Sequence, residues 1–294
     1  MDKTVRRYIF GWEECDLNTY SHAYSIYGGS VCTHPDVLTY LAAKQEKKIK
    51  FFCKRKNGAV VSSTYSVNDS LSLYSKSHPF VFEDIILPSA PGCKLALPFK
   101  TKKLSPLQKN SFINSFGNKI LNDEICHMKP EFSKKTIRKR NSERNRFLKL
   151  GGEIIDIQSL SSEMISDAYI KLFNARWSGK IRPFPRKNLL DAIEKFRPMI
   201  FGSALSINKE IIAIDLILKS ECPEWIYFDD INGGYDPQYN EIGAGSILLW
   251  ENYTRAKEIC QSENKKIIFS LGKLFKGMEY KRQWCDVLPL RRVF

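Results

Sequence analysis

The spacing of apolar residues predicts a succession of short helices and strands in the first half of the chain. Apolar positions recur at helical intervals in two segments, and Pro35 suits the first turn of the second. Apolar runs on either side of Asn57-Gly58 indicate a β-hairpin, because this dipeptide favours a tight turn. The predicted elements are helices over 15–27 and from Pro35 onward, hairpin strands over 49–53 and 59–65, and strands and loops over 66–111.

The spacing of apolar residues predicts helices and strands more clearly in the second half of the chain. Ser161 precedes an amphipathic segment and is expected to cap it as a helix. The polar sequence Asn208-Lys209-Glu210 separates two apolar runs and predicts a second hairpin. The predicted elements are a strand over 153–157, helices over 161–177 and 188–196, hairpin strands over 201–207 and 211–218, a strand over 225–230, a helix over 246–261, a strand over 266–270 and a short helix around 277–284.

The composition is that of a globular protein. The 294 residues, 43% of them hydrophobic, are enough for about two domains. Eight cysteines without C-x-x-C or zinc-ligand spacing predict buried free thiols, no metal site and a reducing compartment. Residues 1–17 carry too many charges for a signal peptide, and no apolar run reaches about 18 residues. We therefore expect a cytoplasmic protein, and peripheral association with an anionic lipid surface stays open.

The positive charge is concentrated in the first half. Residues 1–150 hold 26 lysines and arginines against 13 acidic residues, whereas the remainder holds 20 against 19. The excess peaks in a predicted helix over 133–150, which Gly151-Gly152 would end. It is either a solvated connecting helix or a helix that contacts phosphates of a nucleic acid, a nucleotide cofactor or a lipid head group. Its cations are Lys134, Lys135, Arg138, Lys139, Arg140, Arg144, Arg146 and Lys149, opposed by Glu143. With few aromatic residues, this segment does not predict sequence-specific DNA binding.

A glycine turn precedes the last long helix. The predicted strand 225–230 leads through a loop at Gly233-Gly234, and Gly243 and Gly245 stand at the start of the helix. Glycines there let backbone N–H groups approach an anion, and the helix dipole favours a phosphate. The spacing differs from the Walker A and Rossmann loops.

The turn resembles that of GNAT acyltransferases, whose loop Q/R-x-x-G-x-G/A holds the pyrophosphate of acyl-CoA. The matching positions here read Asn240-x-x-Gly243-x-Gly245, with Asn240 in place of the usual Gln or Arg. The resemblance implies that acyl-CoA binds at Asn240, Gly243, Ala244, Gly245 and Ser246.

The C-terminal segment is similar to Fem-type peptidoglycan aminoacyltransferases, which carry an aromatic-Lys-x-x-aromatic motif. That motif reads Tyr280-Lys281-x-x-Trp284 here, and Ala175-Arg176-Trp177 at a helix end fits the same pattern. The resemblance implies an α+β fold of two GNAT-like lobes with mixed, mostly antiparallel sheets flanked by helices. It adds aminoacyl-tRNA as a second expected donor. The implied parts are a degenerate lobe over 1–132, a basic connecting helix over 133–150 and an acyltransferase lobe over 151–294.

The whole chain resembles the macrophage-inducible (Mig) family of antimicrobial-peptide resistance proteins of Gram-negative bacteria. The resemblance extends to Gly28-Gly29-Ser30-Val31 and His34-Pro35-Asp36-Val37-Leu38 near the start. It implies a role in surviving cationic peptides and association with the inner membrane, without implying a reaction.

Acyl transfer requires a neutral amine, a polarised carbonyl and aligned reactants. We expect the cleft where the strand before the glycine turn diverges from the strand after its helix. On the first strand, Tyr227 and Asp229 point one way and Asp230 the other. Asp229 or Asp230 is the candidate base, because burial raises the pKa of a carboxyl group, and Tyr227 is a candidate proton donor. The structural alternatives are acids that bind loop N–H groups and a tyrosine packed in the core.

Substrate binding is assigned to the end of the chain. The lysine that matches Lys281 helps Fem-type enzymes bind charged substrate, and Ser270 and Trp284 are expected beside it. Asp215 interrupts an apolar strand and needs a partner, for which Arg176 is the candidate.

Three functions remain open. The first is an N-acyl or aminoacyl transferase acting on an envelope component or an amine-bearing peptide, and the basic first half slightly favours a tRNA donor. The second is a non-catalytic adaptor at the inner membrane, favoured by Asn240. The third is a DNA-binding regulator, supported by charge alone. The oligomeric state does not follow from the sequence.

Overall fold

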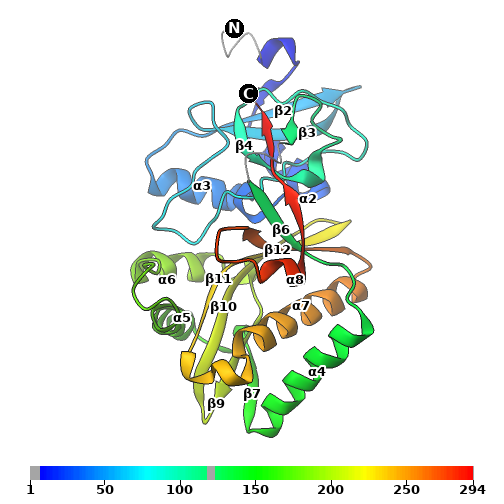
Figure 1. The fold of residues 1–294 in the computed structure, drawn as a ribbon. Coiled ribbons are helices and arrows are strands. Elements are labelled where there is room, and N and C mark those ends of the chain that lie inside the picture. Colours follow the sequence, from blue (N-terminus) through cyan, green and yellow to red (C-terminus); the bar gives the residue numbers. More distant parts are fainter. Residues whose placement is uncertain (1–6, 118–122, 294) are drawn as a thin grey trace.

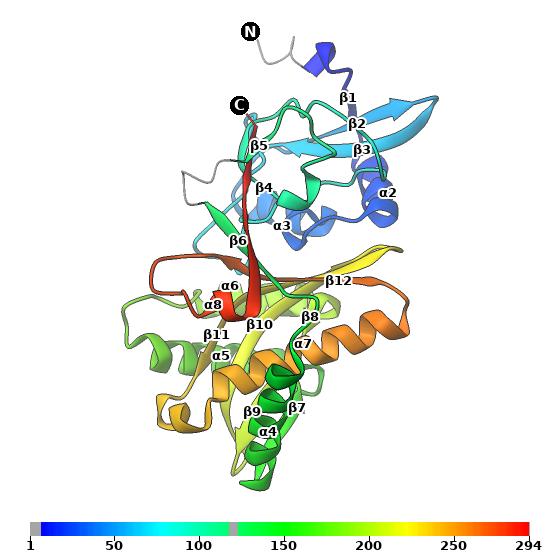
Figure 2. The same ribbon diagram turned by 45° about the vertical axis from the view of Figure 1, so that its right-hand side comes forward.

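The computed structural model describes residues 7–117 and 123–293, which form three β-sheets with helices packed on them (Figures 1 and 2). Residues 1–6, on which part of the expectation about export rests, lie outside these ranges. The first half builds the upper lobe in Figure 1, and the second half builds most of the lower lobe.

The upper lobe contains an antiparallel sheet of order β1-β2-β3. The helix predicted from residue 15 begins at Leu17, because Asp16 caps it by accepting a hydrogen bond from the Thr19 N–H group. The elements of this lobe are β1 (Glu13–Cys15), α2 (Leu17–Tyr27), α3 (Pro35–Lys44), β2 (Lys50–Lys56), β3 (Ala59–Ser66), β4 (Thr101–Leu104) and β5 (Phe116–Gly117).

The lower lobe surrounds an eight-stranded sheet of order β13-β6-β12-β11-β10-β9-β7, in which β8 also pairs with β10. Strands β11 and β12 are parallel, and the other pairs are antiparallel. The strands are β6 (Glu124–Met128), β7 (Gly152–Asp156), β8 (Ile200–Phe201), β9 (Ser203–Ile207), β10 (Glu210–Glu221), β11 (Trp225–Tyr235), β12 (Lys266–Lys273) and β13 (Cys285–Pro289).

Helices cover both faces of this sheet (Figure 1). Because side chains alternate along β11, Tyr227 joins the core beneath α5 and α6, whereas Ile226 and Phe228 pack with α7. The helices are α5 (Ser162–Trp177) and α6 (Arg186–Lys195) on one face, α4 (Lys134–Lys149) and α7 (Ala244–Ser262) on the other, and the short α8 (Lys281–Trp284) beside β13.

Two strands cross between the halves (Figures 1 and 2). Strand β6 belongs by sequence to the segment 1–132, yet it pairs with β12 and β13 in the large sheet. Conversely, β14 (Arg291–Val293) near the C-terminus pairs with β4 and β5 of the upper lobe. Each half therefore completes a sheet of the other.

The predicted α+β class with mostly antiparallel sheets is confirmed, as are both hairpins and a helix over most of 133–150. The predicted loop at Gly233-Gly234 is wrong, because β11 continues to Tyr235 along β10. A Cβ atom on Gly234 would lie 2.3 Å from backbone atoms of Leu172 and Phe173. Glycine therefore allows the strand to lie directly against α5.

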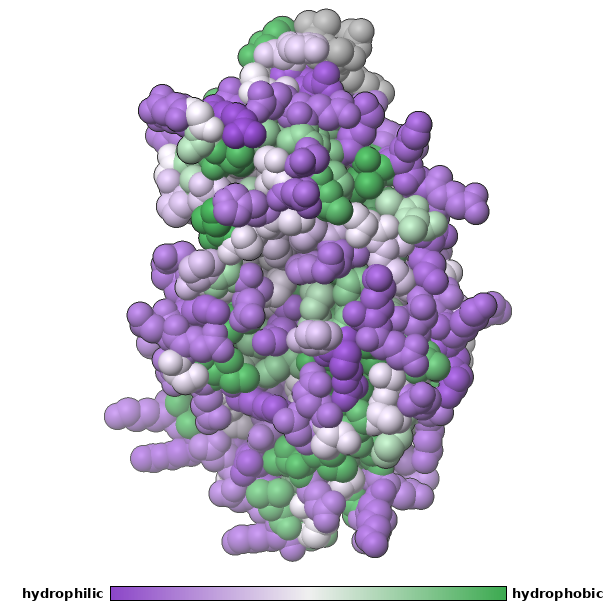
Figure 3. Space-filling model, turned by 180° about the vertical axis from the view of Figure 1, so that it is seen from behind, coloured by the Kyte–Doolittle hydropathy of each residue, from purple (hydrophilic) through white to green (hydrophobic). Residues whose placement is uncertain are grey.

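All eight cysteines carry the free thiols that the sequence predicts, and six of them are buried as expected. Cys15 and Cys93 are partly exposed instead. Across residues 7–117 and 123–293, no helix is long and apolar enough to cross a membrane. Figure 3 shows hydrophilic side chains over most of the rear face, with apolar groups gathered in small patches.

Candidate active site

A cavity opens where β11 and β12 separate, as expected from the sequence. The two strands are hydrogen-bonded as far as the Asp229–Ser270 pair. Beyond it, β11 continues along β10 to Tyr235, and β12 continues along β6 to Lys273. The cavity has a volume of about 430 Å³, and its walls come from β11, β12, α7, α8, the end of α5 and an upper-lobe segment that includes Glu83.

The glycine turn forms one wall of the cavity. Gly243 has a φ of 72°, in the left-handed region, and an added Cβ atom would meet nothing within 4 Å. The Ser246 N–H group donates to the Gly243 carbonyl, whereas those of Ala244 and Gly245 have no hydrogen-bond partner among the described residues. These residues and Asn240 all line the cavity. The turn is therefore open to a negatively charged group.

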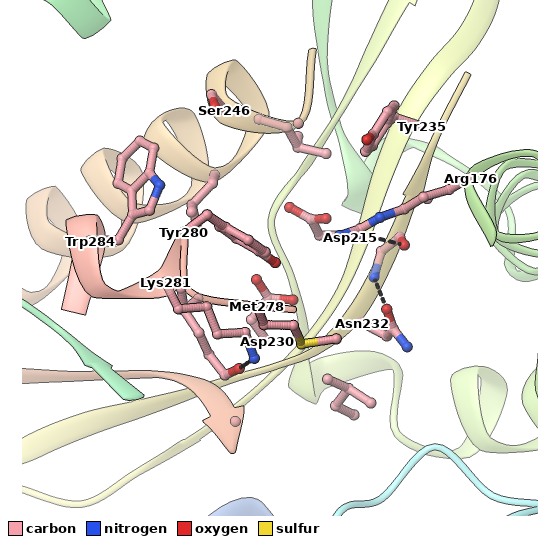
Figure 4. A pocket seen from close by; sticks show the side chains of 18 of the residues that line it. Arg176, Asp215, Asp230, Asn232, Tyr235, Ser246, Met278, Tyr280, Lys281 and Trp284 are labelled. Carbon is pink, nitrogen blue, oxygen red and sulfur yellow. Dashed lines mark hydrogen bonds between the residues drawn. The ribbon is translucent and has the colours of Figure 1, made fainter. Parts of the chain in front are cut away.

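Two carboxyl groups and a guanidinium group meet across the cavity. Figure 4 shows Asp215, Asp230 and Arg176 pointing toward one another. Burial raises the pKa of Asp230 to about 6, against the opposing effect of the Lys281 and Arg176 charges. Burial and the negative charge of Asp230 likewise hold the pKa of Asp215 well above its usual range. A carboxylate of raised pKa is suited to accept a proton from an amine.

Lys281 and Trp284 extend from α8 along the wall beside β12. The Lys281 Nζ atom donates hydrogen bonds to the carbonyl groups of Leu271 at 2.6 Å and Lys273 at 3.0 Å (Figure 4). Trp284 packs against the guanidinium group of Arg140 in α4, whose carbon lies 4.3 Å from the ring centre. Lys281 thus holds a fixed positive charge at the cavity wall.

Tyr227, Asp229 and Ser270 do not line the cavity. Strand alternation turns Tyr227 and Asp229 to the opposite face, where the Tyr227 hydroxyl donates to Asp84 at 3.1 Å. Asp229 is 4% exposed, and burial together with the Asp84 charge holds its pKa well above the usual range. Ser270 is buried and accepts a hydrogen bond from the Gly272 N–H group. The structure therefore brings Asp230, but not these three residues, together with the glycine turn.

Two further residues of this site were missed in the sequence. Asn252 of α7 donates to Asp215 at 3.1 Å, the contact expected from Arg176, which donates instead to the Gly233 carbonyl at 2.9 Å. Asn252 is fully buried, but its sequence neighbourhood is that of an ordinary helix. Glu83 comes from the other half of the chain, where no motif marks it, and accepts a hydrogen bond from the backbone of β12 at 3.0 Å.

The solved structures that match nearly the whole chain include FemX and L-PGS. The crystal structure of FemX gives a TM-score of 0.58 at 6% identity and covers 96% of each chain. The structure of L-PGS from Bacillus licheniformis gives a TM-score of 0.53 at 12% identity, covering 95% of this chain and 92% of that one. At such low identity, these likenesses establish the fold alone, and the expected Fem-type fold is confirmed.

A third match is the C-terminal domain of a protein from Agrobacterium fabrum described as a lysylphosphatidylglycerol synthetase. It has a TM-score of 0.41 and 13% identity and covers 64% of this chain. This chain spans 65% of that structure, just under two thirds of its length. No curated protein sequence matches the chain.

The sequence also matches a family model, described as Mig-14, over residues 34–293. The matched range begins at the residue that caps α3 and includes the glycine turn, β12 and α8. It leaves out only the first 33 residues and the last one. The chain therefore belongs to the Mig-14 family.

Proposed function

We propose that this protein transfers an acyl or aminoacyl group from an activated donor to an amine. The observation that carries the proposal is the cavity between β11 and β12. It places the open glycine turn of α7 opposite Asp230, a carboxyl group of raised pKa, and Lys281, a fixed cation. A phosphate group of the donor would bind at the N–H groups of Ala244 and Gly245.

The proposed step is attack of the amine nitrogen on the ester or thioester carbonyl carbon of the donor. The bond from that carbon to the leaving oxygen or sulfur breaks, the amine loses a proton to Asp230, and Asp230 passes it to the leaving atom. With a pKa of about 6, Asp230 is ionised at neutral pH and is a stronger base than an ordinary aspartate. The positive charge of Lys281 would stabilise negative charge that develops on the carbonyl oxygen.

Two donor classes belong to this proposal, acyl-CoA and aminoacyl-tRNA, and both carry phosphates. The Fem-type fold supports aminoacyl-tRNA. The GNAT-like turn supports acyl-CoA, although Asn240 stands where those enzymes carry Gln or Arg. The proposed acceptor is an envelope component or an amine-bearing peptide.

We further propose that the reaction contributes to resistance to cationic antimicrobial peptides, which membership of the Mig-14 family supports. The same proposal includes a cytoplasmic location at the periphery of the inner membrane. It also includes two lobes, 1–132 and 151–294, connected by the basic segment 133–150.

The test is transfer of a labelled group from mixed aminoacyl-tRNA or from a panel of acyl-CoAs to a cationic peptide or an envelope lipid extract. The Asp230→Asn variant should be slower by about 100-fold or more, because it lacks the base. Asp229→Asn is the matched control, since the neighbouring carboxyl group faces away from the cavity, and it should keep the wild-type rate. A folded wild-type protein that binds neither donor in calorimetry would overturn the proposal. The non-catalytic adaptor at the inner membrane would then be the favoured function.

A further inference from the structure

Helix α4 presents to solvent a cationic face of three cations and two neutral polar residues. At helical spacing, Lys135, Arg138 and Lys149 lie on one side together with the polar residues Ser142 and Asn145, and all five are exposed. None of the three cations has a carboxylate partner within the described ranges. The face extends about 21 Å, at 1.5 Å per residue from Lys135 to Lys149.

Other side chains of α4 hold it against α7, whose first turns line the cavity. Arg144 forms an ion pair with Glu251 of α7 at 2.6 Å, and Asn141 accepts a hydrogen bond from the Trp250 indole at 2.9 Å. Nearer to α8, Arg140 packs on Trp284, which itself lines the cavity.

The end of α4 lies beside the glycine turn. Arg146 donates to the carbonyl group of Glu241 at 3.2 Å, two residues before Gly243. The cationic face therefore belongs to a helix that contacts both α7 and, through Arg140 and Trp284, α8; these two helices border the proposed donor site.

From this arrangement we propose that the outward face of α4 binds the sugar–phosphate backbone of an RNA donor whose esterified 3′ end enters the cavity. The inference rests on the proposed function and selects the RNA donor over acyl-CoA. Cations interleaved with hydroxyl and amide side chains are the groups that contact phosphates in nucleic-acid complexes. A helix that lies in a lipid surface pairs its cations with a broad apolar face, whereas the other side of α4 is occupied by its contacts with α7 and α8.

The experiment measures binding of dye-labelled, deacylated total tRNA to the full chain by fluorescence anisotropy over a range of salt concentrations. The test variant is Lys135→Gln/Arg138→Gln/Lys149→Gln. The matched control, Lys48→Gln/Lys56→Gln/Lys76→Gln, removes the same charge from exposed upper-lobe positions. In the test variant, the negative slope of log affinity against log salt should become shallower by about three, because three phosphate contacts are lost. The affinity should fall about tenfold or more. The control should bind like the wild type.

Two parallel measurements separate this inference from the proposed function. Transfer from a 3′-aminoacyl-adenosine, which has no RNA body, should be equal in the wild type and the test variant. Transfer from acyl-CoA by a wild-type protein that does not bind tRNA would overturn the inference and leave the transferase intact. If tRNA binds through α4 in a salt-dependent way but no group is transferred from any donor, the RNA-binding role of α4 is supported and the proposed transferase activity is refuted.

A further measurement tests whether α4 binds an anionic lipid surface instead of RNA. Vesicles of phosphatidylcholine with phosphatidylglycerol are tested by flotation with the same two variants. If the test variant loses vesicle binding while its tRNA affinity and salt slope stay unchanged, α4 is a lipid-binding surface and the RNA inference is wrong. Circular dichroism spectra that match the wild type establish that both variants are folded.

Discussion

Strand alternation decides which of two adjacent aspartates can reach a substrate. Asp230 lines the cavity, whereas Asp229 faces Asp84 and the upper lobe with 4% of its surface exposed. The sequence identifies both as candidate bases at a strand end, and it predicts that they point in opposite directions. Which direction leads to the cavity depends on the helices that pack on each face, and no local pattern encodes that.

The raised pKa of Asp230 predicts that the transfer rate increases with pH. The base must be ionised, so kcat/KM calculated for the neutral form of the amine should rise about tenfold per pH unit below about 6 and level off above it. In Asp230→Asn, the same quantity should not change in this range. The measurement is kcat/KM for both proteins between pH 4.5 and 8. A wild-type profile that is already level at pH 5 would contradict the assignment.

At the scale of elements, two glycines are required for different physical reasons. Gly243 adopts the left-handed backbone conformation at the start of α7, and an added Cβ atom there would point into open space. Gly234 has no such backbone requirement, but β11 passes so close to α5 that there is no room for a side chain. The sequence alone suggested turns at both positions.

This difference predicts unequal effects of alanine. Gly243→Ala should lower the free energy of unfolding by about 1–2 kcal/mol through its left-handed backbone, and it should also weaken donor binding. Gly234→Ala should lower it by about 3 kcal/mol or more, because the backbone of α5 cannot move away easily. Urea denaturation of the two variants measures both changes. Equal losses of stability would show that the close packing of β11 on α5 is wrong.

At the scale of the whole molecule, a buried ion pair joins the upper lobe to the eight-stranded sheet, in addition to the crossing strands. Nε2 of His127, in β6, lies 2.7 Å from a carboxylate oxygen of Asp84, which also accepts the hydrogen bond of Tyr227. Burial opposes both charges, but their mutual attraction prevails. The pKa of His127 therefore lies above its usual range and that of Asp84 below its own.

The pair predicts a definite pH dependence of stability. His127→Gln should lower the free energy of unfolding by roughly 3–5 kcal/mol, because it leaves Asp84 buried without its charged partner. The contribution of His127 to the free energy of unfolding is complete below about pH 6.5, and it is lost as the pH rises through the raised pKa of this histidine. The contribution of Asp84 is lost in acid, as the pH falls through its lowered pKa. The difference between the two proteins in denaturant titrations should therefore shrink toward pH 9.

The double variant Asp84→Asn/His127→Gln provides the control for this pair. Removing both charges avoids an uncompensated buried carboxylate, so the double variant should be more stable than His127→Gln at neutral pH. If the double variant loses as much as the sum of the two single variants, the two side chains do not act as a pair.

Local patterns along the chain were enough to predict the helices, the hairpins and the open turn before α7. These depend on interactions between residues a few positions apart, so the spacing of apolar residues, the cap at Ser161 and the position of Gly243 are sufficient signals. Family resemblance added the tail motif around Lys281.

The folded chain, and no local pattern, shows which candidate residues lie together. It exchanged β6 and β14 between the halves, brought Glu83 to the cavity and made Asn252 the partner of Asp215. It also separated Asp229 and Ser270 from the glycine turn. The physical reason is that pairing and packing between distant segments depend on the energy of the whole assembled core, which leaves no periodic trace along any one segment.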